Sequence, residues 1–526
     1  MSPQHPPLRP YGRSRVTAPR GDQSAASDRA AIEKVGVPQP VLMENAGRSA
    51  AQILQRLWPE GPVVAVVGAG NNGGDALVLL RTLTAWGRDV TALLVAKRSS
   101  PETVLHGWPV RCVEDRSLEG DAGWEALFAG ASVVVDGILG TGVRGAPRAR
   151  QAEAIRRVNA AARPVLALDI PSGVDAGTGA IPGEAVQAQV TVTFGAPKLG
   201  ALLHPGRARA GRLVAVEIGF PPAPLDAEIA EVVTPAWAQE HLPVRGLDTH
   251  KNAVGRLVIV AGKPGMAGAA VLGARAAFRA GAGLVQVASP APNRAVLQTA
   301  VPEAIFVDPD DGRALEVALE QASAVAVGPG LGTEATGETL LARVLAVPDA
   351  PLVVDADALN LLAVARPRAA ADALRGRPVL VTPHPGEMAR LRAREAAEGA
   401  DRPALARGAA EALGCAVLLK GSPSLVAAPG APLLVDLQGS SDLAVAGMGD
   451  VLTGVCGSLL AQGCAPREAG AVGLYLTGRA ATLAGRGAAL TPSDVVRWLP
   501  DALAERGPGV SDLALPFVVL DLDRAR

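Results

Sequence analysis

Glycines beside aspartates at two points of the chain are the residues best suited to chemistry. Asp75 ends a glycine-rich run that begins at Gly68, directly after the apolar stretch 63–67. Gly449 and Asp450 precede an apolar, helical stretch that runs from residue 451 to about 462. Glycines let the backbone turn tightly, and the free N–H groups at a helix start attract phosphate. An aspartate at such a start can act as a general base, so Asp450 is a candidate catalytic residue.

Two further aspartates of the first half follow apolar runs. Asp136 follows residues 133–135, and Asp169 follows residues 165–168 with Ser172 close behind. Groups at the carboxyl ends of parallel strands converge on one crevice, which argues against a tight turn without a ligand at residues 68–75. The oxygen atoms of Asn72, Asp136 and Ser172 suit an alkali or alkaline-earth cation better than a thiophilic metal.

The second half carries comparable motifs after its own apolar runs. They are the glycine loop 261–268, residues 328–332, residues 355–360, residues 382–387 and the pair Lys420-Gly421. His384 lies between two prolines, which predicts a rigid extended loop. A lone histidine is usually a structural hydrogen-bonding group, but this one follows a predicted strand near similar motifs, which favours a site.

Short apolar runs alternate with stretches of helical length along the chain, as in βα units. We therefore expect an α/β fold with parallel sheets. The Pro-rich segment 219–224 and the polar stretch after it predict a domain boundary near 220–245. The predicted strands are 63–67, 90–95, 132–135, 165–168, 190–194 and 213–217 in the first half, and 257–260, 284–287, 324–327, 352–355, 379–382, 417–420 and 433–436 in the second.

Length and composition exclude several classes of protein. The 526 residues exceed one domain, and the formal net charge of -1 gives no general attraction for nucleic acid or anionic lipid. The four cysteines have no zinc or disulfide spacing, and no apolar run is long enough to cross a bilayer, so we expect a cytoplasmic protein without a membrane partner. Residues 1–25, rich in Pro and Arg, are expected to form a disordered tail rather than a transit peptide.

The first half, residues 26–220, resembles the NAD(P)H-hydrate epimerases and is expected to be a Rossmann-like, doubly wound domain. The resemblance rests on five motifs in order: residues 42–48, 71–75, 140–142, 169–173 and 194–200. It implies that Asp169 is catalytic and that Asn72, Asp136 and Ser172 hold K⁺. It also implies that the hydrated nucleotide is bound by Asn71, Asn72, Gly73, Gly74 and Asp75, by Gly140, Thr141, Gly142, Val143, Arg144, Gly145 and Ala146, and by Asp169.

The second half is expected to form a domain of residues 226–526, which over about residues 230–505 resembles the ribokinase-like kinases and, within them, the nucleotide-dependent NAD(P)H-hydrate dehydratases. The motifs are residues 250–251, 264–270, 279–285, 355–360, 384–387 and 449–452. The resemblance implies that the substrate is bound by Ala270, Gly332, His384 and the catalytic Asp450. It implies that ADP, the nucleotide of bacterial members, is bound with Mg²⁺ by Lys420, Gly421, Ser422, Pro423, Ser424 and Gly449.

The chain departs from the dehydratase pattern at three places. Val445-Ala446 replaces a usual Thr-Gly, Ser440-Ser441-Asp442 replaces Asn-Pro-Gly, and Asn252 replaces a common glycine. These changes bear on the rate of dehydration more than on the fold.

The expected function is repair of hydrated NADH and NADPH. The first domain would interconvert the R and S hydrates, and the second would dehydrate the S hydrate with ADP, giving NAD(P)H, AMP and phosphate. The expected partners are these small molecules and not nucleic acid. The sequence is compatible with a homo-oligomer. Two alternatives remain: a ribokinase-like kinase fused to a Rossmann-type domain, which would accumulate a phosphorylated product, and a nucleotide-binding module without turnover.

Overall fold

The chain folds into two compact units. A computed structural model describes residues 15–98, 104–118, 120–221, 226–246, 248–347, 349–364, 372–391, 401–505 and 517–519. The first unit comprises Met1–Ala230 and Pro508–Asp523, and the second comprises Glu231–Gly507 and Arg524–Arg526. The predicted boundary region 220–245 includes this junction, and residues 222–224 of its Pro-rich segment lie outside the described residues.

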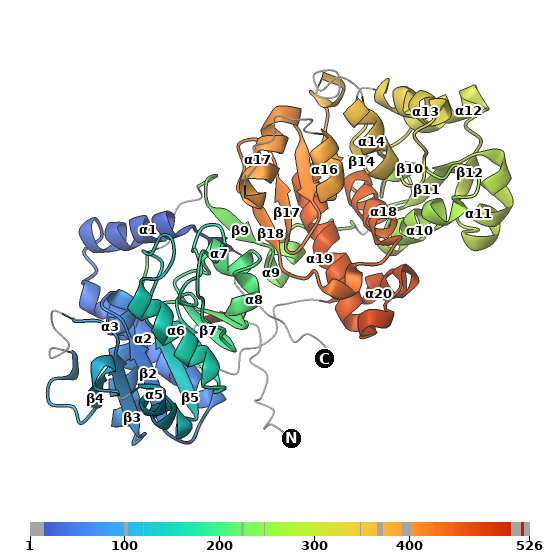
Figure 1. Cartoon of the computed structure of the whole chain (residues 1–526). Helices are drawn as coiled ribbons and strands as arrows, with labels where there is room; N and C mark the ends of the chain where they lie inside the picture. The colour runs from blue at the N-terminus through green and yellow to red at the C-terminus, as the bar shows by residue number, and fades with distance from the viewer. Residues whose placement is uncertain are drawn as a thin grey trace. The chain divides into compact units, whose positions relative to one another are not determined.

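Unit 1 is built on a sheet with the strand order β19-β8-β7-β6-β5-β2-β3-β4. Figure 1 labels β2, β3, β4, β5 and β7 of this sheet. Its strands are parallel except for the antiparallel pair of β19 and β8. The bounds are β2 (Val63–Val67), β3 (Val90–Leu94), β4 (Arg111–Glu114), β5 (Val133–Gly137), β6 (Val165–Leu168), β7 (Val190–Phe194), β8 (Arg212–Val216) and β19 (Phe517–Val519).

Helices cover both faces of this sheet because its strands are apolar on both sides. Val63, Ala65 and Val67 of β2 face one core with α2 and α3, whereas Val64 and Val66 face another with α5 and α6. The helices are α1 (Gly21–Glu33), α2 (Gln39–Leu57), α3 (Asn71–Ala85), α5 (Gly120–Ala129), α6 (Ala149–Ala160), α7 (Leu199–Leu202) and α8 (Arg207–Ala210), with a 3-10 turn η1 (Asp115–Ser117).

The winding of the sheet reverses at β2, which lies between β3 and β5. Connections on the two sides of such a point lead to opposite faces, and a crevice opens at the carboxyl ends of the two strands. The amide of Gly68, directly after β2, donates to the carbonyl of Gly137 at the end of β5, with N···O 3.0 Å. The predicted Rossmann-like arrangement is confirmed.

The predicted disordered tail is too long. Residues 1–14 lie outside the described residues, but Val16–Ala18 forms strand β1 and α1 begins at Gly21. Val16 and Ala18 are buried, and the carbonyl of Pro19 accepts a hydrogen bond from the amide of Leu199, with N···O 3.0 Å. The many prolines led to a prediction of disorder for this segment, because its folded structure depends on contacts with residues far along the chain.

Unit 2 contains the larger sheet, which runs in the order β9-β18-β17-β16-β15-β14-β13-β10-β11-β12. The strands from β16 through β15, β14, β13, β10 and β11 to β12 are parallel, and β17 is antiparallel to both neighbours. The bounds are β9 (Ala230–Val232), β10 (Arg256–Val260), β11 (Leu284–Ala288), β12 (Ile305–Val307), β13 (Ala324–Val327), β14 (Leu352–Val354), β15 (Val379–Val381), β16 (Ala416–Leu419), β17 (Ser424–Ala427) and β18 (Leu434–Asp436).

The apolar helices α10, α18 and α19 share a core with one face of this sheet, and α20 packs against α19. Leu257 and Ile259 of β10 belong to this core, as do Val451 and Val455 of α18. The helices are α9 (Pro235–Glu240), α10 (Ala267–Arg279), α11 (Arg294–Ala300), α12 (Gly312–Glu320), α13 (Ala335–Leu345), α14 (Ala356–Val364), α16 (Pro385–Leu391), α17 (Arg402–Leu413), α18 (Met448–Ala461), α19 (Pro466–Ala484) and α20 (Pro492–Ala504), with 3-10 turns η2 (Ala291–Asn293), η3 (Ser441–Leu443) and η4 (Gly487–Ala489).

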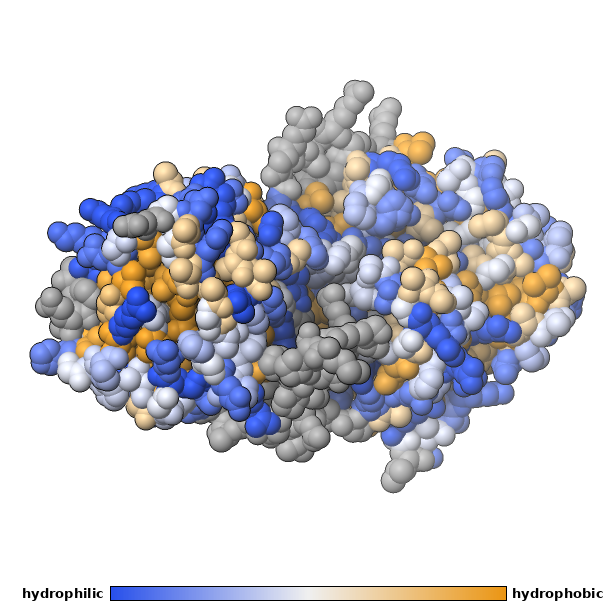
Figure 2. Space-filling view, turned by 60° about the horizontal axis from the view of Figure 1, so that its bottom comes forward, coloured by the Kyte–Doolittle hydropathy of each residue, from blue (hydrophilic) through white to orange (hydrophobic). Residues whose placement is uncertain are grey.

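All predicted strands are present, with ends shifted by at most two residues. The strands that the pattern missed are short or polar: β1, β4, β9, β12, β17 and β19. Hydrophilic residues cover much of the surface, with apolar patches between them (Figure 2). Within the described part of the chain, every helix is too short or too polar to cross a bilayer.

Candidate active sites

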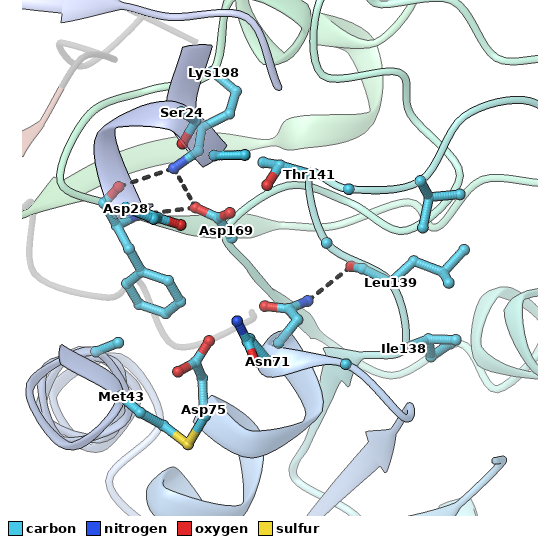
Figure 3. A pocket seen from close by; sticks show the side chains of 18 of the residues that line it. Ser24, Asp28, Met43, Asn71, Asp75, Ile138, Leu139, Thr141, Asp169 and Lys198 are labelled. Atoms are coloured by element: carbon cyan, nitrogen blue, oxygen red, sulfur yellow. Dashed lines mark hydrogen bonds and ion pairs between the residues drawn. The ribbon is translucent and has the colours of Figure 1, made fainter. Parts of the chain in front are cut away.

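Unit 1 has a cavity of about 670 Å³ at the carboxyl ends of β2, β5 and β6 (Figure 3). The loop after β2 and the start of α3 form one wall, and the segment 138–144 forms another. Helices α1 and α2 contribute further lining residues. The cavity therefore lies in the crevice that the strand order predicts for a ligand.

Glycines make the β2–α3 turn possible. A Cβ atom on Gly68 would lie 1.9 Å from the carbonyl oxygen of Ile138, and one on Gly73 would lie 2.2 Å from that of Gly68. Neither contact is tolerable, so these positions need glycine. The turn places the first residues of α3, with their free amide groups, at the cavity wall.

Asp169 lies directly after β6 and is paired with a buried lysine. Its backbone has φ 66°, a left-handed conformation that is uncommon for a residue with a side chain. The Nζ atom of Lys198 lies 2.5 Å from Asp169 Oδ1 and also donates to the carbonyl of Phe194 at 2.8 Å. Lys198 is only 2% exposed, and a buried ammonium requires such partners. The sequence motif 194–200 contained Lys198, but its role emerges only from this pairing.

Two more carboxyl groups border the cavity. Burial raises the pKa of Asp75 well above its usual range, and the charges of Asp169 and Asp28 raise it further. Burial likewise raises the pKa of Asp28, which Lys198 partly opposes. Sequence reasoning missed Asp28, because no glycine or strand end marks its position in α1.

The predicted cation ligands do come together. The side chain of Ser172 donates to Asp136 Oδ1 at 2.6 Å, and its amide donates to Oδ2 at 2.8 Å. Asn72 and Ser172 both bond the peptide groups of Leu139, with Asn72 Nδ2 2.7 Å from the carbonyl oxygen. Asn72 Oδ1 is buried without a partner, and burial raises the pKa of Asp136 to about 6. A monovalent cation would satisfy the orphaned oxygen and the buried carboxylate, so the donor set fits K⁺.

The other predicted substrate residues of unit 1 divide into two groups. Residues that line the cavity are Asn71, Asn72, Asp75, Gly140, Thr141, Gly142, Val143, Arg144, Ala146 and Asp169. Gly73, Gly74 and Gly145 do not line it. Gly73 and Gly74 instead keep α3 close to its neighbours, because a Cβ atom at either would clash within 2.6 Å.

In unit 2, a buried aspartate and a lysine meet at the ends of β14 and β16. Asp355 is 2% exposed, and its Oδ1 lies 2.6 Å from Lys420 Nζ. The hydroxyl of Thr453 in α18 donates to Asp355 Oδ2 at 2.6 Å. This triad connects two strand ends to the start of α18. Thr453 was not predicted, because no local signal distinguishes it from other helical threonines.

Asp450 lies in the first turn of α18 beside this triad. Burial raises the pKa of Asp450 to about 6, and the charges of Asp355 and Asp357 act in the same direction while Lys420 opposes them. A Cβ atom on Gly449 would lie 3.4 Å from Lys420 Nζ. The predicted base and the predicted phosphate-binding lysine therefore lie at the same helix start.

His384 is fixed by a carboxylate three residues further on. Its amide donates to Glu387 Oε2 at 2.8 Å, and its Nδ1 accepts from the amide of Gly386 at 2.9 Å. Burial raises the pKa of Glu387. The charge of Asp355 acts in the same direction, whereas that of Lys420 lowers this pKa. The imidazole of His384 is half-exposed, and its other nitrogen, Nε2, lies 3.4 Å from Glu387 Oε1.

Gly332 and the predicted nucleotide turn have defined geometry. The amide of Gly332 donates to Asp357 Oδ2 at 2.8 Å. Residues 420–424 form a tight turn between β16 and β17, in which Ser424 Oγ donates to the carbonyl of Gly421 at 3.0 Å. Arg402 of α17 donates to the carbonyl of Lys420 at 3.3 Å and adds a positive charge that sequence reasoning missed.

The side chain of Ala270 does not support the predicted contact with the substrate. It lies in α10 and is fully buried in the core of unit 2. Only its backbone is available to a ligand, and the predicted contact stays a prediction.

A Rossmann-like unit and a ribokinase-like unit in one chain, each with a carboxylate site at its strand ends, define a two-domain nucleotide-handling enzyme. A family described as NAD(P)H-hydrate dehydratase matches residues 257–500, and one described as YjeF-related protein N-terminus matches residues 39–200. The bifunctional NAD(P)H-hydrate repair enzyme of Moorella thermoacetica is 36% identical and covers 90% of this chain and 94% of its own length. That of Escherichia coli is 37% identical and covers 88% of each.

Among solved structures, the ADP/ATP-dependent NAD(P)H-hydrate dehydratase of Bacillus subtilis, co-crystallised with ATP/Mg²⁺, is 25% identical with a TM-score of 0.43. It covers 53% of this chain and 99% of its own. The identity and coverage of the full-length relatives establish that the chain belongs to the family of bifunctional NAD(P)H-hydrate repair enzymes.

Proposed function

We propose that the chain repairs hydrated NADH and NADPH with a division of labour between its units. Residues 26–220 would epimerise the R and S hydrates, and residues 226–526 would dehydrate the S hydrate with ADP to give NAD(P)H, AMP and phosphate. The observation that carries this proposal is that each unit has its own carboxylate-lined site, one around Asp169 and one around Asp450.

Epimerisation requires that the bond from the ring carbon to its hydroxyl group breaks and forms again on the other face. The cavity of unit 1 supplies carboxyl groups for the proton transfers, and among them Asp169 Oδ1 lies 2.5 Å from Lys198 Nζ. A carboxylate at this place would stabilise positive charge on the ring while the hydroxyl group is detached. Thr141 and Arg144 line the same cavity and suit the polar nucleotide.

Dehydration in unit 2 would begin with phosphorylation, because hydroxide is a poor leaving group and phosphate is a good one. Asp450 would accept the proton of the ring hydroxyl as the β-phosphoryl group of ADP is transferred and AMP leaves. The amide groups at the start of α18 and the ammonium of Lys420 would stabilise the transferred phosphoryl group. Loss of the phosphate and of a ring proton then restores the double bond.

Two metal ions accompany this proposal. K⁺ would be held by Asn72, Asp136 and Ser172, where it would anchor the 138–144 wall of the cavity. Within the described residues no group of three or more His, Cys, Asp or Glu side chains could hold a metal. This suits Mg²⁺ that arrives with ADP, since Mg²⁺ commonly binds phosphates and water with only one or two carboxylates.

This repair would take place in the cytoplasm. Its partners would be small-molecule substrates. The four cysteines are free thiols, and Cys415 and Cys456 are buried, which is compatible with a reducing compartment.

The test is an assay of the purified protein with a mixture of hydrated NADH epimers, ADP and Mg²⁺. Recovery of the absorbance of reduced nicotinamide, release of AMP and consumption of both epimers would support the proposal. A phosphorylated hydrate that accumulates would point instead to a kinase, and binding without any turnover would point to a nucleotide-binding module. ATP in place of ADP, with release of ADP measured, would show which nucleotide is used.

A further inference from the structure

Helix α1 forms part of the cavity in unit 1, although it precedes residue 39, where the family match begins. Ser24, Ala25, Asp28 and Ile32 of α1 are all lining residues. The Asp28 carboxyl group accepts no hydrogen bond and forms no ion pair within the described part of the chain. It is drawn beside the Lys198–Asp169 pair in Figure 3.

The cavity holds more carboxyl groups than its lysine can pair. Lys198 is bonded to Asp169, which leaves Asp28 and Asp75 without a partner. Asp75 is only 8% exposed and lies on the opposite wall, on α3. Asp28 is partly buried, and carboxyl groups that are withdrawn from water without a partner are costly, so natural proteins keep them mainly where they serve a ligand or a reaction.

Resting on the epimerase function proposed for unit 1, we propose that Asp28 is a further catalytic residue, which works with Asp75 as a pair of proton-transfer groups on two walls of the cavity. One carboxyl group protonates the ring hydroxyl, the carbon–oxygen bond breaks with its electron pair on oxygen, and water forms. The lone pair of the adjacent ring nitrogen forms a C=N bond to that carbon. Water then adds to the opposite face, and the other carboxylate takes its proton.

The step is balanced, because the water released is equivalent to the water added and one proton passes from one carboxyl group to the other. Asp169, paired with Lys198, stabilises the cationic ring. The charge of Asp28 raises the pKa of Asp75, so the two groups resist simultaneous ionisation, which favours one proton donor and one acceptor. Other charged groups near the pair are Arg29 beside Asp28 and Arg98 behind Asp75.

The test is the Asp28→Asn variant of the full chain. We expect kcat for conversion of R hydrate to S hydrate to fall about 10²-fold or more, with KM changed less than about 3-fold. Dehydration of pure S hydrate should be unchanged, which shows that the chain is folded. The matched control is Asp22→Asn, since Asp22 lies on the same helix with its side chain 52% exposed and does not line the cavity. Asp28→Glu should retain part of the rate with a shifted pH profile, because the replacement carboxyl group titrates at a different pH.

Two results with Asp28→Asn would overturn the proposal. A parent-like kcat in Asp28→Asn would remove Asp28 from the reaction, and a raised KM with unchanged kcat would make it a binding residue. If Asp28→Asn does not fold, Asp28→Glu decides: a folded Glu variant whose pH profile is identical to that of the parent, or one with no activity and no binding, would indicate a structural role. Absence of epimerisation in the parent protein would instead overturn the function proposed for unit 1.

Discussion

At the scale of single residues, the two sites depend on carboxyl groups whose ionisation is set by burial. Burial, and next to it the charges of Asp355 and Asp357, raise the pKa of Asp450 to about 6, while the charge of Lys420 lowers it. A general base works best when its pKa lies slightly below the working pH, because it is then ionised and still basic. Asp450 meets this condition at neutral pH.

The rate of dehydration should therefore fall as the pH decreases through about 6, because protonated Asp450 cannot accept the hydroxyl proton. An ordinary aspartate would place this limb near pH 4. The measurement is kcat for pure S hydrate with ADP between pH 5 and 8. Asp450→Asn should lower kcat by about 10²- to 10⁴-fold and retain ADP binding. Equal turnover in the variant would exclude Asp450 as the base.

The buried carboxylate of Asp136 should make unit 1 respond to K⁺. We expect the Tm of the parent protein to rise with KCl relative to choline chloride, because an ion that binds only the folded state stabilises it. Asp136→Asn should lose this response, since the amide carries no charge. Asp121→Asn, at a side chain that is 74% exposed, is the control and should keep the response. A K⁺ response that persists in Asp136→Asn would place the cation elsewhere.

At the scale of elements, the start of α18 decides where Asp450 points. Gly447 caps this helix with φ 94°, and a Cβ atom there would lie 2.9 Å from Leu272 Cδ1 and 3.1 Å from Pro492 Cγ. Glycine is required both for the conformation and for the space. The neighbouring Val445 and Ala446 depart from the family pattern, but they leave this glycine in place.

Gly447→Ala should raise the KM for ADP and lower the Tm, because the helix start must shift to avoid the clash. Gly430→Ala is the matched control, since Gly430 has φ 64° and open space around its Cβ position. Both variants carry a conformational cost of about 1–2 kcal/mol, but only Gly447→Ala should alter KM. Equal KM values in the two variants would show that the start of α18 does not position the nucleotide.

At the scale of the whole molecule, the two units should work independently on a diffusing substrate. Asp169→Asn should stop epimerisation and leave R hydrate unconsumed at early times, while Asp450→Asn should stop dehydration of both epimers. A mixture of the two variants should consume both epimers, because each supplies the activity that the other lacks. Early time courses by chromatography that separates the epimers provide the measurement. Failure of the mixture would mean that the hydrate does not pass freely between molecules.

Most strands, and the motifs that follow them, could be predicted from the sequence, because the buried parallel strands of this chain are short apolar runs followed by glycine or aspartate. Short or polar strands such as β4 and β17 escaped, since neighbours in space rather than local sequence stabilise them. The folded structure of residues 15–25 was not predicted for the same reason, because α1 borders a cavity whose other walls come from distant segments.

The sequence by itself determined the α/β class, the family motifs and the candidate residues Asn72, Asp136, Asp169 and Asp450, because each follows a local pattern. Only the tertiary structure decided which charges meet. It paired Lys198 with Asp169 and Lys420 with Asp355, and it brought Asp28 to the cavity of unit 1. These pairings depend on burial and on distances between remote segments, which determine the cost of each charge and cannot be read from neighbouring residues.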